Sequence, residues 1–128
     1  MNSYLPREHS AQFVRSFTGV SIPAGAVREA LTFRVPDLHG GRVRLYAFTL
    51  RQNSNDERHS IQIQGDGLDT GLVVVPDQML ATLLPASQLQ IWHPCIWTLR
   101  SLGQYTIRVR NDGVATHVWS GSIVGYTC

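Results

Sequence analysis

The sequence predicts an all-β protein, an antiparallel sandwich of about eight strands, and three observations support this prediction. Short runs of β-branched and aromatic residues recur between turn-forming residues, at a spacing of about 8–12 positions. Several runs alternate apolar and polar residues, the period of a strand with one buried face. No long helical pattern separates the runs, which excludes a parallel α/β sheet. Among sandwiches, eight short strands favour a jelly roll over an immunoglobulin-like arrangement.

The clearest pattern lies in residues 103–126. Tyr105, Ile107 and Val109 alternate with polar residues, so they predict a strand with one buried face. Residues 111–113 (Asn-Asp-Gly) tolerate positive φ, and a second β-branched and aromatic run follows them. We therefore expect a β-hairpin that closes the sheet.

The preceding part of the chain supplies the other expected strands. Residues 11–18 fit either a first strand or a short helical turn, of which the strand is favoured, and Gly19 ends the segment. Residues 42–51 predict a central strand. The continuous apolar run 45–50 indicates cover on both of its sides. Pro94 cannot donate to a sheet ladder, so it marks an edge, a bulge or a strand switch. The remaining strands are expected at 27–35, 60–64, 72–75 (short and buried), 89–92 and 96–99.

The segments between these strands predict turns, one loop and one helix. Residues 36–41 and 65–71 are turns by composition, and the polar stretch 52–59 is expected to be an exposed loop. Residues 77–84 predict one short helix, with a capping aspartate at its start and a shared apolar face. Residues 1–10 are expected to be a flexible N-terminal arm, and residues 11–128 a single β-sandwich domain.

The composition indicates an assembly component. Charged residues make up 16% of the chain, well below the ~25% of typical soluble domains. Eleven arginines and no lysine give a formal net charge of +2. Interfaces are depleted in charge and enriched in Trp, Tyr and Arg, so we expect a homo-oligomer or a place in a larger assembly. The basic residues are scattered, which argues against direct nucleic-acid binding.

The N-terminal sequence argues against export. MNSYLPREHS has neither an apolar core segment nor a cleavage site, so we expect no signal peptide. No apolar run approaches the ~20 residues of a spanning helix. We expect a protein that acts where it is made, without a membrane span.

No catalytic or metal motif is evident. Two aspartates among the glycines of residues 65–71 suit a tight turn better than a calcium loop. His93 and Cys95 offer two ligands where zinc needs three or four. Residues 121–125 lack the spacing of a nucleophile elbow. We therefore predict no enzyme activity, no metal and no cofactor. Cys95 and Cys128 are either bridged or free.

The three tryptophans, Trp92, Trp97 and Trp119, are the candidate site residues. Aromatic faces bind sugar rings, so the three could form a ligand-stacking platform. The favoured interpretation is packing in the core and at interfaces.

Three segments carry a family resemblance: VSIPAGA at 20–26, YTIRV at 105–109 and WSGSIVGY at 119–126. With these, the chain resembles small single jelly-roll structural proteins of viruses and bacteriophages, of the penton, minor capsid or decoration type. The resemblance implies a non-enzymatic virion structural protein, made in the host cytoplasm, that contacts itself and other virion proteins. It carries over no functional residues. The alternative is a carbohydrate- or receptor-binding β-sandwich module.

Overall fold

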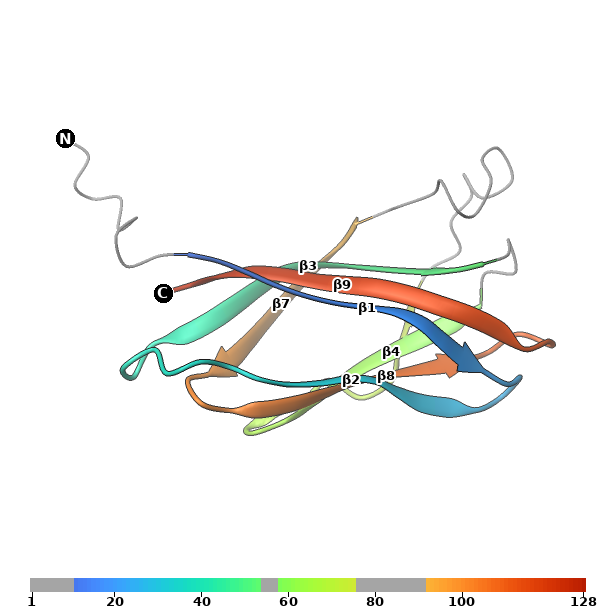
Figure 1. Ribbon diagram of the computed structural model, residues 1–128, viewed down its shortest axis with the longest axis horizontal. Helices are drawn as coiled ribbons and strands as arrows, with labels where there is room; N and C mark the ends of the chain where they lie inside the picture. The colour runs from blue at the N-terminus through green and yellow to red at the C-terminus, as the bar shows by residue number, and fades with distance from the viewer. Residues whose placement is uncertain (1–10, 54–57, 76–91) are drawn as a thin grey trace.

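Two packed antiparallel sheets make up the computed structural model, which describes residues 11–53, 58–75 and 92–128 (Figure 1). No helix occurs among these residues, so the predicted all-β sandwich is confirmed. The strands are β1 (Gln12–Ile22), β2 (Val27–Arg34), β3 (Arg42–Gln52), β4 (His59–Gly65), β5 (Leu68–Asp69), β6 (Val73–Val75), β7 (Trp92–Arg100), β8 (Gln104–Asn111) and β9 (His117–Thr127). The expected arm 1–10, the expected helix 77–84 and most of the run 89–92 lie outside the described residues.

The strand order is that of a jelly roll. Sheet A has the order β1-β9-β3-β7, and sheet B has the order β2-β8-β4-β5, with β6 also paired to β4. Asp69 of β5 lies opposite Gln64 and Val75 of β6 lies opposite His59, so β5 and β6 act as one interrupted strand along β4. The chain changes sheet after β1, β2, β3, β6, β7 and β8. This alternation, with the first strand beside the last, favours the jelly roll over the immunoglobulin-like order.

The predicted hairpin over residues 103–126 is wrong. β8 pairs with β2 and β4 in sheet B, whereas β9 pairs with β1 and β3 in sheet A. Asn111 is buried at the point where the chain crosses between the sheets. Its Nδ2 donates to the carbonyls of Ile22 (2.9 Å) and Ala115 (2.7 Å), and its Oδ1 accepts from the Gly113 N–H (2.8 Å). The crossing lets β8 and β9 each bury an apolar face against the other sheet.

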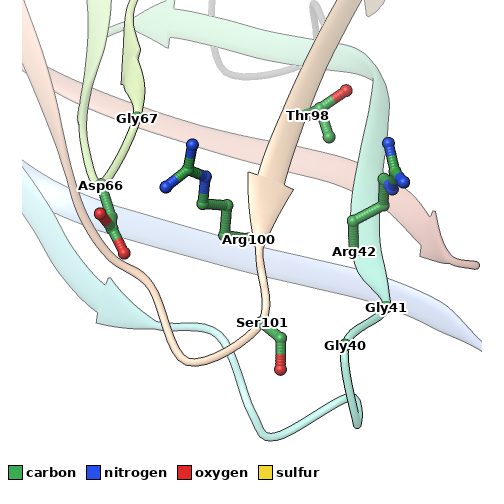
Figure 2. Close-up of a pocket in the computed structure, with 8 residues that line it drawn as sticks. All are labelled: Gly40, Gly41, Arg42, Asp66, Gly67, Thr98, Arg100 and Ser101. Atoms are coloured by element: carbon green, nitrogen blue, oxygen red, sulfur yellow. The ribbon is translucent and has the colours of Figure 1, made fainter.

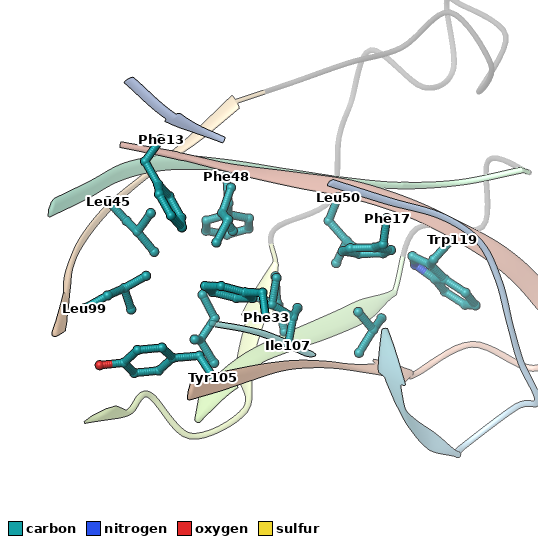
Figure 3. Close-up of a cluster of buried hydrophobic side chains, with 14 of the residues drawn as sticks. Phe13, Phe17, Phe33, Leu45, Phe48, Leu50, Leu99, Tyr105, Ile107 and Trp119 are labelled. Carbon is teal, nitrogen blue, oxygen red and sulfur yellow. The ribbon is translucent and has the colours of Figure 1, made fainter. Parts of the chain in front are cut away.

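The core lies between the sheets and is rich in aromatic rings (Figure 3). Phe33 packs between Phe13 and Tyr105, with ring centroids 6.0 Å apart in both pairs. Trp119 is completely buried, and its Nε1–H donates to Nδ1 of His59 at 3.0 Å. The predicted alternation in β4 and β8 is confirmed, because their inward side chains are all buried: Ile61, Ile63, Tyr105, Ile107 and Val109.

Two β-bulges change the predicted strands. Gly19 does not end β1, because a register shift between Phe17 and Val20 carries the strand on to Ile22, with Gly19 at a φ of 69°. Glycine adopts this conformation at little steric cost. In β3, a register shift after Leu45 turns Tyr46 outward. β3 is central in its sheet, as predicted, but described residues cover only its inner side.

Burial corrects two further predictions. Residues 52–59 are not uniformly exposed, since Gln52 and His59 end the flanking strands inside the sandwich. β6 is not a buried strand: Val75 is buried, but Val74 is 66% exposed because β6 lies outermost in its sheet. Pro94 lies in β7, the edge strand of sheet A, opposite Ala47 at the β3 bulge. Of the three alternatives for Pro94, the edge and the bulge are confirmed. The expected separation of the runs 89–92 and 96–99 is wrong, because β7 is continuous from Trp92 to Arg100.

Candidate protein-contact surface

The outer face of sheet B is polar, and its side chains bond to one another. The hydroxyls of Thr32 and Thr106 lie 3.1 Å apart across β2 and β8. Arg108 forms an ion pair with Glu29 at 3.4 Å and a hydrogen bond with Gln64. Such a face is well solvated, and nothing in its chemistry calls for a covering partner.

The outer face of sheet A combines an apolar area with polar groups at its borders. These groups include Arg44, opposite Tyr126, and the hydroxyls of Ser16 and Ser122, which lie 2.7 Å apart. One register row crosses all four strands and consists of Val14, Val124, Ala47 and Pro94. Exposed aromatic and aliphatic side chains flank this row on β3, β7 and β9. We call the set the apolar face: Val14, Tyr46, Ala47, Trp92, Pro94, Ile96, Val124 and Tyr126.

The apolar face contains a depression of about 520 Å³. Val14, Tyr46, Trp92 and Val124 line it, so all four strands of sheet A contribute. Tyr46 and Trp92 are both 47% exposed, and the Tyr46 ring also lies 6.1 Å from that of Tyr126. On the same face, Ile96 is 95% exposed. Burying this surface is favourable, because apolar area leaves water.

The structure places the three tryptophans in three different environments. Trp92 stands exposed on the apolar face. Trp97 is half-buried and stacks on Phe48, with ring centroids 5.5 Å apart and an interplanar angle of 16°. Trp119 is in the core. The three rings therefore do not share one surface, and a contact or stacking role for Trp92 stays a prediction.

Sequence reasoning did not select Tyr46, Tyr126 or Val14 as contact residues. A signal was present for Tyr46, because the unbroken apolar run 45–50 has more apolar residues than one buried face needs. That pattern predicts cover on the second side but does not say whether the same chain or a partner supplies it. With the described residues alone, Tyr46 remains 47% exposed.

The glycine-rich segment 65–71 forms a turn in which Asp69 is tied locally. Its Oδ1 accepts hydrogen bonds from the Gly71 N–H (2.9 Å) and from Gln62 (2.8 Å). These two bonds, that from Gly71 more than that from Gln62, hold the pKa of Asp69 below its ordinary value. Within the described ranges, no group of three His, Cys, Asp or Glu side chains is placed to hold a metal. The predicted absence of metal and cofactor stays a prediction.

His93 and Cys95 both point toward the inner side of β7. His93 packs against Phe48, with ring centroids 5.2 Å apart, and burial lowers the pKa of its imidazole. Cys95 packs against the core, and burial raises the pKa of its thiol to about 11. The two cysteines are free rather than bridged.

The two cysteines are expected to differ in reactivity. At pH 8, iodoacetamide should modify exposed Cys128 quickly and Cys95 far more slowly, since a pKa of about 11 leaves on the order of one thiol in 1,000 ionised. Mass spectrometry of timed samples measures both rates. In urea the two rates should converge. Equal rates in the folded protein would contradict the burial of Cys95.

The described part of the chain contains no apolar helix of the length needed to span a bilayer. No protein-family model matches the sequence, and no curated protein matches it.

Several solved structures show weak similarity to this chain. The infectious bursal disease virus VP2 subviral particle gives a TM-score of 0.46 at 11% identity, covering 91% of this chain and 32% of that one. Dimeric latent PorU from Porphyromonas gingivalis gives 0.46 at 6% identity, and this chain spans 13% of its length. The C-terminal CBM6 of LamC from Zobellia galactanivorans gives 0.39 at 13% identity, covering 88% of this chain and 98% of that one. Similarity at this level does not identify a function.

Proposed function

We propose that this protein is a non-enzymatic virion structural protein that acts through protein–protein contacts made by its apolar face. The observation that carries the proposal is the contrast between the two outer faces of the sandwich. The polar side chains on the outer face of sheet B bond to one another. The outer face of sheet A has one such pair, Ser16 and Ser122, and beside it presents eight apolar residues, including Tyr46, Trp92 and Tyr126. Exposed patches of this kind mark interaction sites, and interface cores favour aromatic residues over charges.

The first partner of the apolar face is a second copy of the chain. Two-fold contacts use the same patch on both subunits, so the patch must complement itself. Here the exposed rings of Tyr46 and Trp92 border a depression of about 520 Å³ that can receive a ring from the other copy. Neither the ring residues nor Val14 carries a charge that would repel its own copy. In a virion, edge strands of the two sheets, such as β1, β2 and β7, supply further surface for other shell proteins.

A pair of matched substitutions tests the contact. Val14→Arg places a charge on the apolar face, and Val74→Arg places the same charge on exposed β6 of the other sheet. In sedimentation velocity, the wild-type protein and Val74→Arg should form dimers or larger species. Val14→Arg should shift to the monomer, because a guanidinium in an apolar interface loses its hydration. A monomeric wild-type protein, or equal behaviour of the two variants, would contradict the proposal.

Location is tested separately from assembly. Mass spectrometry of density-gradient fractions from the native source should find the chain in the particle fraction, at a constant ratio to the other shell proteins. Its absence from particles would overturn the virion assignment while leaving the self-contact intact.

One observation favours a second function, carbohydrate binding. Gln12 and Ser122 line the same depression as the exposed Trp92 ring. An aromatic face beside hydrogen-bonding groups is the arrangement that sugar rings require. Binding on a glycan array that Trp92→Ala removes would replace the proposed function with this one. Trp97→Ala is the matched comparison, because that ring stacks on Phe48.

A further inference from the structure

A polar pocket of about 520 Å³ lies at one end of the sandwich, away from the depression on the apolar face (Figure 2). Three segments meet there: the loop before β3, the β4–β5 turn and the corner after β7. The lining residues are Gly40, Gly41, Arg42, Asp66, Gly67, Thr98, Arg100 and Ser101.

Two arginines dominate the charge of this pocket. Arg42 of β3 and Arg100 of β7 are direct register partners in the antiparallel ladder. Like charges placed opposite each other across two strands are destabilising. Neither guanidinium has a hydrogen bond or an ion pair with any residue that the structure describes. Asp66 lines the pocket without pairing to either, so the three side chains leave one net positive charge.

Hydrogen bonds hold the walls of the pocket in place. The buried Tyr105 hydroxyl accepts from the Arg100 N–H (2.8 Å) and donates to the Asp66 carbonyl (2.7 Å), which ties β7 to the β4–β5 turn. Ser101 Oγ accepts from the Leu38 N–H at 2.7 Å, which ties the corner to the loop before β3. The walls of the pocket are therefore formed in advance of any ligand, whereas the Arg42 and Arg100 side chains, which point away from each other in Figure 2, must turn toward a shared ligand.

The backbone around the pocket departs from relaxed geometry. His39 and Leu102, the two non-glycine residues with positive φ in the described chain, each adjoin a lining residue. Gly67 leaves room for the Arg100 guanidinium, since a Cβ there would come within 2.9 Å of Cζ. Strained backbone and an unpaired like-charge pair are stability costs that tend to gather at functional sites.

We propose that this pocket binds a phosphate group, held by the guanidinium groups of Arg42 and Arg100. Guanidinium forks match the oxygens of a dianion, and two of them on adjacent strands fit one tetrahedral group better than a single carboxylate. Bound phosphate also offsets the net positive charge of the pocket. Its source is the free ion or a phosphomonoester, and both present the same oxygens to the pocket.

Calorimetry with inorganic phosphate in low-salt buffer tests the site. We expect one phosphate per chain, with affinity that falls as sodium chloride is added. Arg42→Gln and Arg100→Gln should each weaken binding at least about tenfold, since each removes charge-assisted hydrogen bonds. Asp66→Asn should tighten binding, because it removes the one opposing charge from the pocket.

Arg28→Gln is the matched control, because Arg28 is an exposed arginine in β2 that does not line the pocket. It should bind phosphate like the wild type, and thermal unfolding establishes that every variant is folded. O-phosphoserine provides the second arm: tighter binding than phosphate assigns the site to a phosphorylated ligand, and equal binding assigns it to the free ion. No binding to either probe, or equal losses in Arg28→Gln and both pocket variants, would overturn the proposal. Weaker phosphate binding by Asp66→Asn than by the wild-type protein would also overturn it.

Discussion

Replacing Trp119 by alanine is expected to lower the free energy of unfolding by about 3–5 kcal/mol, the usual range for a large aromatic residue removed from a core. Trp119 is completely buried, and its ring meets those of His59 and His117 edge-on. The substitution leaves a cavity and also removes the bond from the indole N–H to His59. Urea unfolding followed by circular dichroism measures the loss.

Trp92→Ala is the control for this prediction. The Trp92 ring is 47% exposed, so its loss should change the stability of the isolated chain by less than about 1 kcal/mol. Trp119→Phe keeps an aromatic ring in the core but removes the indole donor and part of the ring volume, so its loss sets an upper limit on the contribution of the bond to His59. If Trp92→Ala lowered the free energy of unfolding as much as Trp119→Ala, the difference in burial between the two side chains would not explain their contributions to stability.

The strands themselves could be predicted from local patterns. Ile61 and Ile63 alternate with polar residues, and so do Tyr105 and Ile107, and each of these four side chains is buried as expected. Such a pattern depends only on the pleat of one strand, which places alternate side chains on opposite faces. A short window of sequence is therefore sufficient for it.

The pairing of the last two strands could not be predicted in the same way. Residues 111–113 do carry turn chemistry, and the Asn111 side chain does accept a bond from the Gly113 N–H. Turn residues report only that the chain changes direction. Whether the next strand returns to the same sheet depends on which distant strands pair with its backbone edges, and for β9 these are β1 and β3.

The pocket arginines show the same limit. Arg42 and Arg100 lie 58 positions apart in the sequence, and no motif links them. Their placement opposite each other follows from the β3–β7 register, which is a property of the assembled sheet. The exposed Tyr46 is different, since the excess apolar run around it was visible in the sequence and the unpredicted bulge decided which side it faces.

Replacing Asn111 by alanine is the second substitution with a large expected effect, about 2–4 kcal/mol of unfolding free energy. The side chain is fully buried and makes three hydrogen bonds to backbone groups. Alanine leaves the buried carbonyl of Ile22 without this partner, which costs about 1–3 kcal/mol, and it also removes the partly buried bonds to Ala115 and Gly113. Because the bonds connect the end of β1 to the β8–β9 crossing, the loss should loosen both sheets at this corner. Hydrogen exchange of the Gly113 and Val118 amides, read beside urea unfolding, measures the local and the global effect.

Asn53→Ala provides the matched control for this corner. Asn53 is exposed, and its Oδ1 accepts a single bond from the Val118 N–H at 3.1 Å, so water can replace the lost partner. Its removal should cost less than about 1 kcal/mol and speed exchange at Val118 without affecting Gly113. If Asn111→Ala were as mild as Asn53→Ala, the crossing would be held by apolar packing of β8 and β9 alone. The hydrogen bonds of the Asn111 side chain would then contribute little to the stability of the β8–β9 crossing.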